Sequence, residues 1–190
     1  MRVSRACVNT LPDPRTFAYR IDVNDRIEWV SDTWKAFARE NGAAHLADNA
    51  VGTRLWDHIT GVETREIYRA LFARARASMR PACVPFRCDA PARVRAMELT
   101  LIALPDHSIE IRCVEQWGRE REPIGLLDAT LPRSDELLAM CSWCKRVRLD
   151  EWIEPEVAVA RLGLFVDTAV LPRLTHGICP QCQAELTAGI

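Results

Sequence analysis

The sequence predicts an α+β fold built on an antiparallel sheet. Two β-rich runs come first, several helical segments follow, and three further β-rich runs complete this part of the chain. Elements in that order cannot form βαβ repeats, so we expect a five-stranded antiparallel sheet with the helices packed on one side. Two Cys-x-x-Cys pairs near the C-terminus predict a second, smaller unit, a zinc-knuckle domain.

The composition is that of a folded globular protein. Of the 190 residues, 48% are hydrophobic and 27% are charged, and the formal net charge is −1. This balance provides no general attraction to nucleic acid. The chain has no apolar run of about 18 residues, and its first residues lack the apolar core of a signal peptide. We therefore expect a cytoplasmic protein that does not enter a membrane.

A β-hairpin and a capped helix open the first unit. Residues 17–30 alternate apolar and polar side chains on either side of Asn24-Asp25, a pair that favours turns. Ser31 can cap a helix over residues 32–40, and a glycine shortly afterwards ends it. An irregular stretch is expected from there to residue 50.

A second helix and three strands complete this unit. Residues 63–78 place Ile67 and Leu71 on one face, which is the pattern of an amphipathic helix. The strands are expected over residues 82–89, 94–104 and 108–117. The unit thus spans residues 17–117 and follows an N-terminal extension of residues 1–16.

A charged stretch separates the two predicted units. Residues 118–134 begin with Gly-Arg-Glu-Arg-Glu and carry no apolar stripe, so we expect a linker. Residues 135–190 then form the zinc-binding unit. A helix started by proline is expected over residues 155–164, and a closing helix over residues 181–186.

The two cysteine pairs carry the strongest chemical signal. They are Cys141-Ser-Trp-Cys144 and Cys179-Pro-Gln-Cys182, and the 34 residues between them leave room for an inserted helix. Each pair can offer two sulfurs from one turn, so together they fill the four positions of a tetrahedral zinc ion. Such a zinc is structural, because no coordination position stays open for water or substrate. It would supply folding free energy that so small a unit lacks.

Other roles for these residues remain as alternatives. Cys141 and Cys144 could instead form a redox dithiol, or all four cysteines could be buried in reduced form. His176 lies three residues before Cys179. We expect it to hydrogen-bond behind the metal ligands, with direct ligation in place of a cysteine as the alternative.

A nucleic-acid-binding regulator is the alternative function. Lys145, Arg146 and Arg148 follow the first cysteine pair and would contact phosphates in such a protein. The small unit as a whole carries more acidic than basic side chains, which speaks against a nucleic-acid surface.

The C-terminal sequence resembles a small cysteine-rich tail found after sensory domains in bacterial signalling proteins. In that family a basic pair, an acidic turn and a tryptophan typically follow the first cysteine pair, and a Ser/Thr-His-Gly step introduces the second. The matching residues are Lys145-Arg146, Asp150-Glu151, Trp152 and Thr175-His176-Gly177. Residues 159–172 depart from the family pattern, because they are longer and more apolar.

The first unit resembles a PAS domain, a sensory fold with a five-stranded antiparallel sheet around a few helices. The resemblance lies in the order of elements and in phrases such as Val51-Gly52 before Leu55-Trp56. It implies a cavity that holds haem, flavin, a small metabolite or side chains alone. Haem would need a histidine on a helix that lines the cavity, and His45 and His58 are the only histidines of the helical region. We expect His58 to be packed or hydrogen-bonded rather than a haem ligand. No cysteine phrase of the flavin-adduct kind is present.

These resemblances predict a bacterial sensory or regulatory protein and not an enzyme. No Ser/His/Asp set, Gly-rich phosphate loop or pair of catalytic carboxylates occurs with supporting context. A small molecule or protein bound to the PAS-like unit would change how the zinc tail is presented to a protein partner or to a second copy in a homodimer. Cys83, Cys88 and Cys113 fall in predicted strands, where we expect small buried residues rather than thiol sensors.

Overall fold

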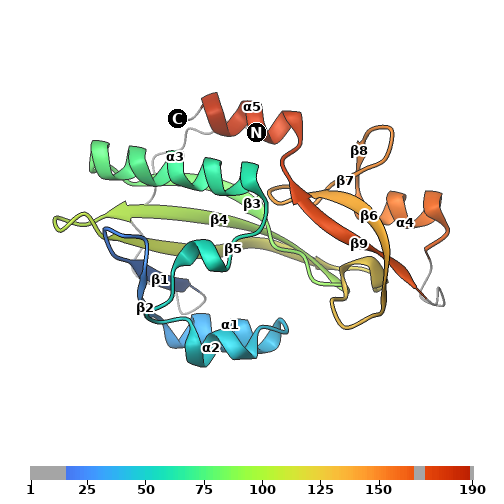
Figure 1. The fold of residues 1–190 in the computed structure, drawn as a ribbon, viewed down its shortest axis with the longest axis horizontal. Coiled ribbons are helices and arrows are strands. Elements are labelled where there is room, and N and C mark those ends of the chain that lie inside the picture. The colour runs from blue at the N-terminus through green and yellow to red at the C-terminus, as the bar shows by residue number, and fades with distance from the viewer. Residues whose placement is uncertain (1–15, 165–169, 189–190) are drawn as a thin grey trace.

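The computed structural model describes residues 16–164 and 170–188, so the predicted N-terminal extension lies almost entirely outside the described residues. The described chain is α+β, as predicted, and contains two sheets. Figure 1 shows the larger sheet at the centre, with α1 and α2 at one end of the molecule and α3 along β4. None of the described helices is both long and apolar enough to cross a membrane.

The larger sheet is the predicted five-stranded antiparallel one. Its strand order is β2-β1-β5-β4-β3, and every pair of neighbours is antiparallel. The strands are β1 (Phe17–Ile21), β2 (Ile27–Val30), β3 (Ala82–Arg87), β4 (Arg93–Ala103) and β5 (Ile109–Glu120). The expected hairpin is confirmed, because β1 and β2 pair across the Asn24-Asp25 turn, where Asp25 has a φ of 60°.

Three α-helices and one 3₁₀ turn connect β2 to β3. They are α1 (Asp32–Glu40), α2 (Ala44–Asn49), η1 (Leu55–Asp57) and α3 (Val62–Ser78). Ser31 caps α1 as predicted, since its Oγ accepts a hydrogen bond from the Trp34 N–H at 3.1 Å. The irregular stretch expected before residue 50 is instead α2, a six-residue helix without a side-chain cap. So short an element shows no apolar period in the sequence.

The helices α1 and α3 pack on the same face of this sheet. Alternate strand residues share a face, and Tyr19 and Ile21 are therefore on one side of β1. Tyr19 contacts Trp34 of α1, with ring centroids 6.4 Å apart, while Ile21 belongs to the same hydrophobic cluster as Phe72 of α3. This face is the main core of the protein, and we call it the inner face.

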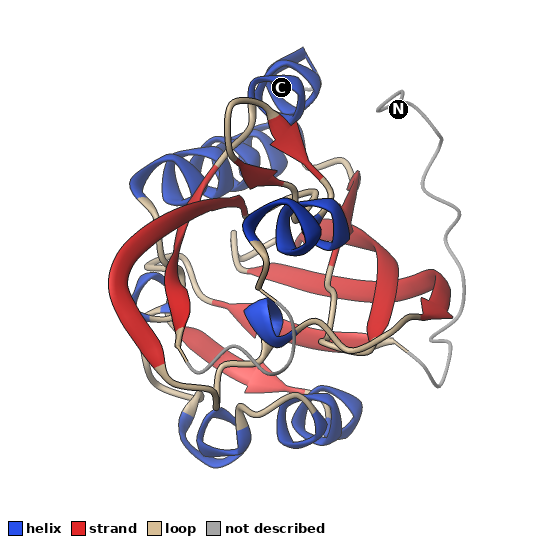
Figure 2. Ribbon diagram, turned by 90° about the vertical axis from the view of Figure 1, so that its right-hand side faces the viewer, coloured by secondary structure: helices blue, strands red, loops and turns tan. Residues whose placement is uncertain are grey.

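The second sheet has four strands in the order β8-β7-β6-β9. They are β6 (Arg133–Cys141), β7 (Val147–Arg148), β8 (Trp152–Ile153) and β9 (Leu171–Gly177). β6 and β9 are parallel, whereas the other pairs are antiparallel. The two predicted helices of this region are present as α4 (Pro155–Leu162) and α5 (Pro180–Ala188). In Figures 1 and 2, α5 and α3 lie at the opposite end of the molecule from α1 and α2.

The stretch expected as a linker is largely ordered. β5 continues to Glu120, three residues beyond the predicted end of its strand, and η2 (Gly125–Leu127) follows. Ile124 and Leu126 are buried in a second hydrophobic cluster together with Leu138 of β6 and Ala158 of α4. These two apolar side chains are too few to form a stripe in the sequence, but each is worth about 1.5–3 kcal/mol when buried.

Candidate metal centre

Parallel pairing of β6 with β9 brings the two cysteine pairs together. Cys141 is the last residue of β6 and pairs with Gly177 at the end of β9, so both strands end at the same edge. The chain then turns after each strand. Lys145, with a φ of 64°, closes the first turn, and Cys182 lies in the first turn of α5.

The four cysteine sulfurs form a compact group. Those of Cys141, Cys144, Cys179 and Cys182 all lie within 4.8 Å of one another, and Cys144 Sγ and Cys179 Sγ are 3.7 Å apart. The backbone N–H of Cys179 donates to Cys141 Sγ at 3.4 Å, and that of Cys182 donates to Cys179 Sγ at 3.4 Å. Such N–H groups stabilise thiolates, so this arrangement can hold a metal ion such as zinc.

The pKa values within the group show how strongly the sulfurs interact. Hydrogen bonds from Cys144 and Cys182 lower the pKa of Cys141. Donating such a bond raises the pKa of Cys144 to about 12, and the pKa of Cys182 is raised for the same reason. Because adjacent thiolates repel one another, all four sulfurs can ionise together only when a cation balances their charge.

His176 is not a member of this sulfur group among the residues that the structure describes. It lies in β9, where it pairs with Met140 of β6. Burial and the neighbouring Lys145 lower the pKa of His176, so its imidazole is favoured in the neutral form. Its predicted place behind the metal ligands stays a prediction.

Trp143 anchors the first cysteine turn in the main core. The side chain is 5% exposed, and its Nε1 donates to the Pro85 carbonyl of β3 at 2.8 Å. Its ring centroid lies 5.4 Å from that of Tyr68 and 6.4 Å from that of Phe86. In the other direction, the backbone N–H of Arg87 donates to the Trp143 carbonyl at 2.8 Å. The first cysteine turn is therefore attached to β3 and α3.

One hydrophobic cluster extends from the inner face to the cysteines. It contains Leu99 and Ile111 of the large sheet together with Cys141, Cys179 and Leu186 of the small unit. Gly61, at the start of α3, allows a close approach to β9, because a Cβ atom there would lie 2.5 Å from the His176 carbonyl oxygen. The two predicted units thus share a core.

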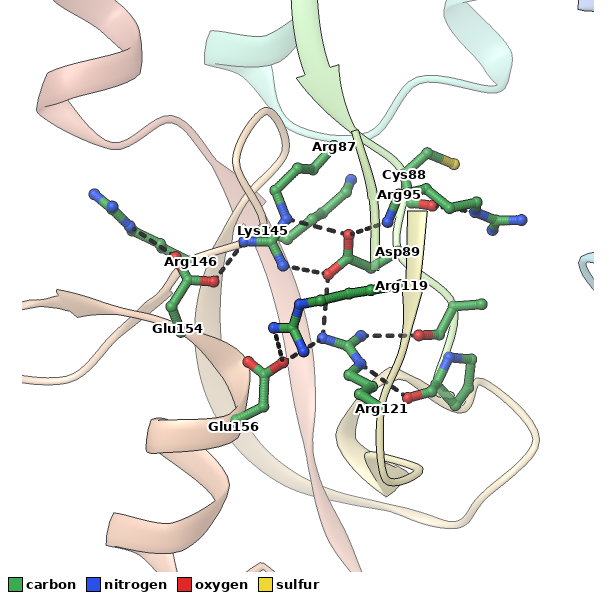
Figure 3. Close-up of polar contacts among 12 residues, drawn as sticks. Arg87, Cys88, Asp89, Arg95, Arg119, Arg121, Lys145, Arg146, Glu154 and Glu156 are labelled. Carbon is green, nitrogen blue, oxygen red and sulfur yellow. Dashed lines mark hydrogen bonds and ion pairs between the residues drawn. The ribbon is translucent and has the colours of Figure 1, made fainter. Parts of the chain in front are cut away.

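A network of charged side chains joins the sheets beside this core (Figure 3). The Asp89 side chain is 1% exposed and pairs with Arg87 and with Arg121, the latter at 3.2 Å. Arg87 also pairs with Glu154, directly before α4, and Arg121 pairs with Glu156 in the first turn of α4 at 3.0 Å. Buried carboxylate and guanidinium groups are thereby paired across the boundary between the two sheets.

The network joins two segments that are far apart in the sequence. Arg121 lies in the stretch predicted as a charged linker, and Asp89 lies just after β3. Arg121 also donates to the carbonyl oxygens of Ala90 at 2.8 Å and Pro91 at 3.0 Å. Its side chain is only 3% exposed. The run Gly-Arg-Glu-Arg-Glu has the composition of a solvated segment, so nothing in the sequence marks this one arginine as buried.

Two of the three basic residues considered for phosphate binding are engaged within the protein. Lys145 Nζ donates to the Ser142 carbonyl at 2.9 Å. Arg146 pairs with Glu154 at 3.2 Å and donates to Gln181 at 2.9 Å. Arg148 is exposed. The three side chains therefore do not form a set of free cations.

The remaining predicted residues have ordinary partners or surroundings. His58 Nε2 lies 2.7 Å from Thr53 Oγ1, in keeping with the hydrogen-bonded role expected for it. Burial raises the pKa of Cys113 to about 12, which keeps it a thiol and disfavours a thiolate sensor. Cys83 is disulfide-bonded, so the expectation of a free buried thiol is wrong at that position.

Comparison with known proteins gives no family. No protein-family model matches the chain, and no curated protein matches it.

Trp143 provides a test of the shared core. Changing Trp143→Ala should lower the free energy of unfolding by about 3–5 kcal/mol, because a buried aromatic ring and its hydrogen bond are lost. Urea denaturation of the full chain measures this change. Trp117→Ala is the matched control, since Trp117 is 52% exposed and should cost much less. Equal losses in both variants would show that Trp143 has no special role.

Arg121 provides a test of the charged network. Arg121→Met should lower the free energy of unfolding by about 3–5 kcal/mol, because it leaves the buried Asp89 carboxylate short of a partner. Arg119→Met removes an arginine whose side chain is 60% exposed and lies 3.7 Å from Glu156, and should change stability by less than about 1 kcal/mol. A loss in Arg121→Met no greater than in Arg119→Met would contradict the network's importance.

Proposed function

We propose that this protein is a non-enzymatic sensory or regulatory protein, in which a PAS-like unit binds a ligand and a zinc-stabilised unit passes on its state. Support for the PAS-like unit comes from the element order, with helices inserted between the second and third strands of a five-stranded antiparallel sheet. The single observation that carries the proposal is the hydrophobic cluster that runs from the inner face to the cysteines. A ligand that repacks the inner face would act on the metal-binding turn through direct contacts.

Zinc is the metal that best suits the four sulfurs. A tetrahedral Zn²⁺ with Zn–S distances of about 2.3 Å separates its ligands by about 3.8 Å, close to the distance between Cys144 and Cys179. Cys141, Cys144, Cys179 and Cys182 would occupy all four positions. The ion would balance the thiolate charge and fix the ends of β6 and β9, without an open position for chemistry.

The close grouping of the four cysteine sulfurs argues against the dithiol alternative. A reductase using Cys141 and Cys144 would need one reactive thiolate with access to a substrate, yet Cys141 is buried beside three further sulfurs. The nucleic-acid alternative loses support because Lys145 and Arg146 have partners within the protein. We therefore expect the output to be a contact with a protein partner or with a second copy of the chain.

Zinc content and its pH dependence test the metal assignment. The purified protein should carry one zinc per chain, and Cys144→Ser should lower both zinc content and thermal stability, while Cys88→Ser should leave them unchanged. Acidification should release zinc, because thiolate ligands must take up protons as the metal leaves. Native mass spectrometry and circular dichroism across a pH series follow both quantities. A folded, stable protein without metal would contradict the assignment.

Hydrogen exchange tests the sensory role. Native mass spectrometry of freshly purified full chain would identify retained small molecules and the oligomeric state. Removing a retained molecule by dialysis should change amide exchange in residues 141–146 and 177–183, since both lie against the shared core. Exchange at Asp106 and His107, in the exposed turn between β4 and β5, serves as the internal control. Unchanged exchange and unchanged oligomeric state would count against signal transfer.

A further inference from the structure

The inner face carries a buried arginine that lacks an anionic partner. Arg95 of β4 is 8% exposed, and it is the one charged residue that is buried as a whole among the described residues. Its Nε donates to the Cys88 carbonyl at 2.6 Å, and its Nη2 donates to Asn41 Oδ1 at 2.6 Å. The guanidinium carbon lies 4.9 Å from the centroid of the Phe37 ring of α1. All of these partners are neutral.

Arg121 shows what the same fold does with another buried arginine. Its side chain is 3% exposed and pairs with two carboxylates, those of Asp89 and Glu156. Arg95 has no ion pair in the described part of the chain. In Figure 3 its guanidinium points away from the Asp89 carboxylate, although its backbone N–H donates to Asp89 Oδ1 at 3.4 Å. The charge of Arg95 is thus left without the compensation that Arg121 receives.

A buried cation without a counter-charge is costly, and buried charges in proteins are normally paired. Part of the guanidinium of Arg95 is also unused. Nη1 has no hydrogen-bond acceptor among the described residues. It is nevertheless in contact with solvent, because the one fully buried side-chain nitrogen or oxygen without a hydrogen-bond partner among these residues is Arg20 Nε, not Arg95 Nη1. Nη1 and the second proton of Nη2 together form one edge of the fork, which matches the two oxygens of a carboxylate.

The Arg93–Glu115 ion pair lies at the edge of this face, beside Phe17 and Phe37. Two tyrosines and a cysteine packed against the same core are neutral. Tyr19 and Cys113 lie on this face in neighbouring strands, and Tyr68 lies close to Trp143 at the other side of the core. Burial raises the pKa values of Tyr19, Tyr68 and Cys113, so these groups remain protonated donors. Neither phenol hydroxyl has a hydrogen-bond partner among the described residues. A ligand here would meet one positive charge without an anionic partner, neutral donors and aromatic rings, with the Arg93–Glu115 ion pair at the edge.

We propose that Arg95 recognises the carboxylate of a small organic acid, whose apolar body lies against the aromatic side chains of the inner face. One fixed cation suits a monoanion better than a phosphate dianion, and the single free edge suits two carboxylate oxygens. This inference rests on the proposed sensory function and names the chemical class of its ligand. Binding would give Arg95 the counter-charge that the chain itself does not supply.

Calorimetric titration of the zinc-loaded full chain tests this proposal. The probes are benzoate, phenylacetate and hexanoate, with benzamide as the neutral isostere and inorganic phosphate as the alternative anion. At least one carboxylate should bind saturably at one per chain and at least tenfold more tightly than benzamide and phosphate. Arg95→Met should weaken that binding about 10- to 100-fold, as expected for a lost charge-assisted hydrogen bond.

Arg112→Met is the matched control, because Arg112 lies in the neighbouring strand β5 on the opposite face from Cys113 and pairs with Glu110, which would keep its second partner Arg20. Its carboxylate affinity should stay within twofold of the parent protein. Arg95→Met should fold and retain zinc, since no carboxylate is left unpaired. Should that variant fail to fold, Arg95→Lys keeps the charge, loses the fork and should still bind at least tenfold more weakly.

Three results would overturn the proposal. They are the absence of saturable binding by any of the three carboxylates, equal binding of benzamide or phosphate, and undiminished binding by the folded Arg95 variants. Zinc content and oligomeric state are measured on the same samples. A zinc-loaded protein that retains a different molecule and does not bind carboxylates would overturn this inference alone. A metal-free monomer that binds none of the probes and retains no small molecule would overturn the proposed function as well.

Discussion

The parallel pairing of β6 with β9 is the constraint on which the small unit depends. Four sulfurs can share one ion only if two segments separated by 34 residues end side by side. Parallel strands cannot be joined by a tight turn, so the chain must cross over between them, and it does so through β7, β8 and α4. The long spacing between the cysteine pairs is therefore a requirement of the topology. The spacing is longer than in compact zinc ribbons because the residues between the two cysteine pairs form the whole connection from β6 to β9.

A second constraint comes from Trp143, which lies inside the first cysteine pair. Its ring is part of the same cluster as the inner face of the larger sheet. A metal ion held by Cys141 and Cys144 would fix the turn that presents this ring, and the ring in turn packs on Tyr68 and Phe86. Metal binding would thus be coupled to the packing of the larger unit through one side chain. This coupling gives the proposed signal a physical route.

Local patterns made much of the fold predictable from the sequence. The hairpin, the helix capped by Ser31 and the cysteine turns each depend on a few neighbouring residues. The six-residue α2 was missed because it shows no period, and β6 and β9 were missed as partners because their pairing is non-local. The buried roles of Arg95 and Arg121 could not be foreseen either. Both occur among many exposed arginines, and only their three-dimensional neighbours distinguish them.

The ordered segment after β5 has a consequence for how such proteins can be recombined. Arg121 is bound to two backbone carbonyls of the β3–β4 connection and to a carboxylate of α4. A domain that follows a flexible linker can be replaced by another domain without disturbing the first. The segment after β5 is not such a linker, because Arg121 fixes it to the β3–β4 connection and to α4. A chimera that joined residues 135–190 to a different N-terminal domain would also need the hydrogen-bond acceptors around Arg121 and the surface on which Trp143 packs. Residues 135–190 therefore depend on the surface of the larger unit on which they pack, and they cannot be transferred to another protein without it.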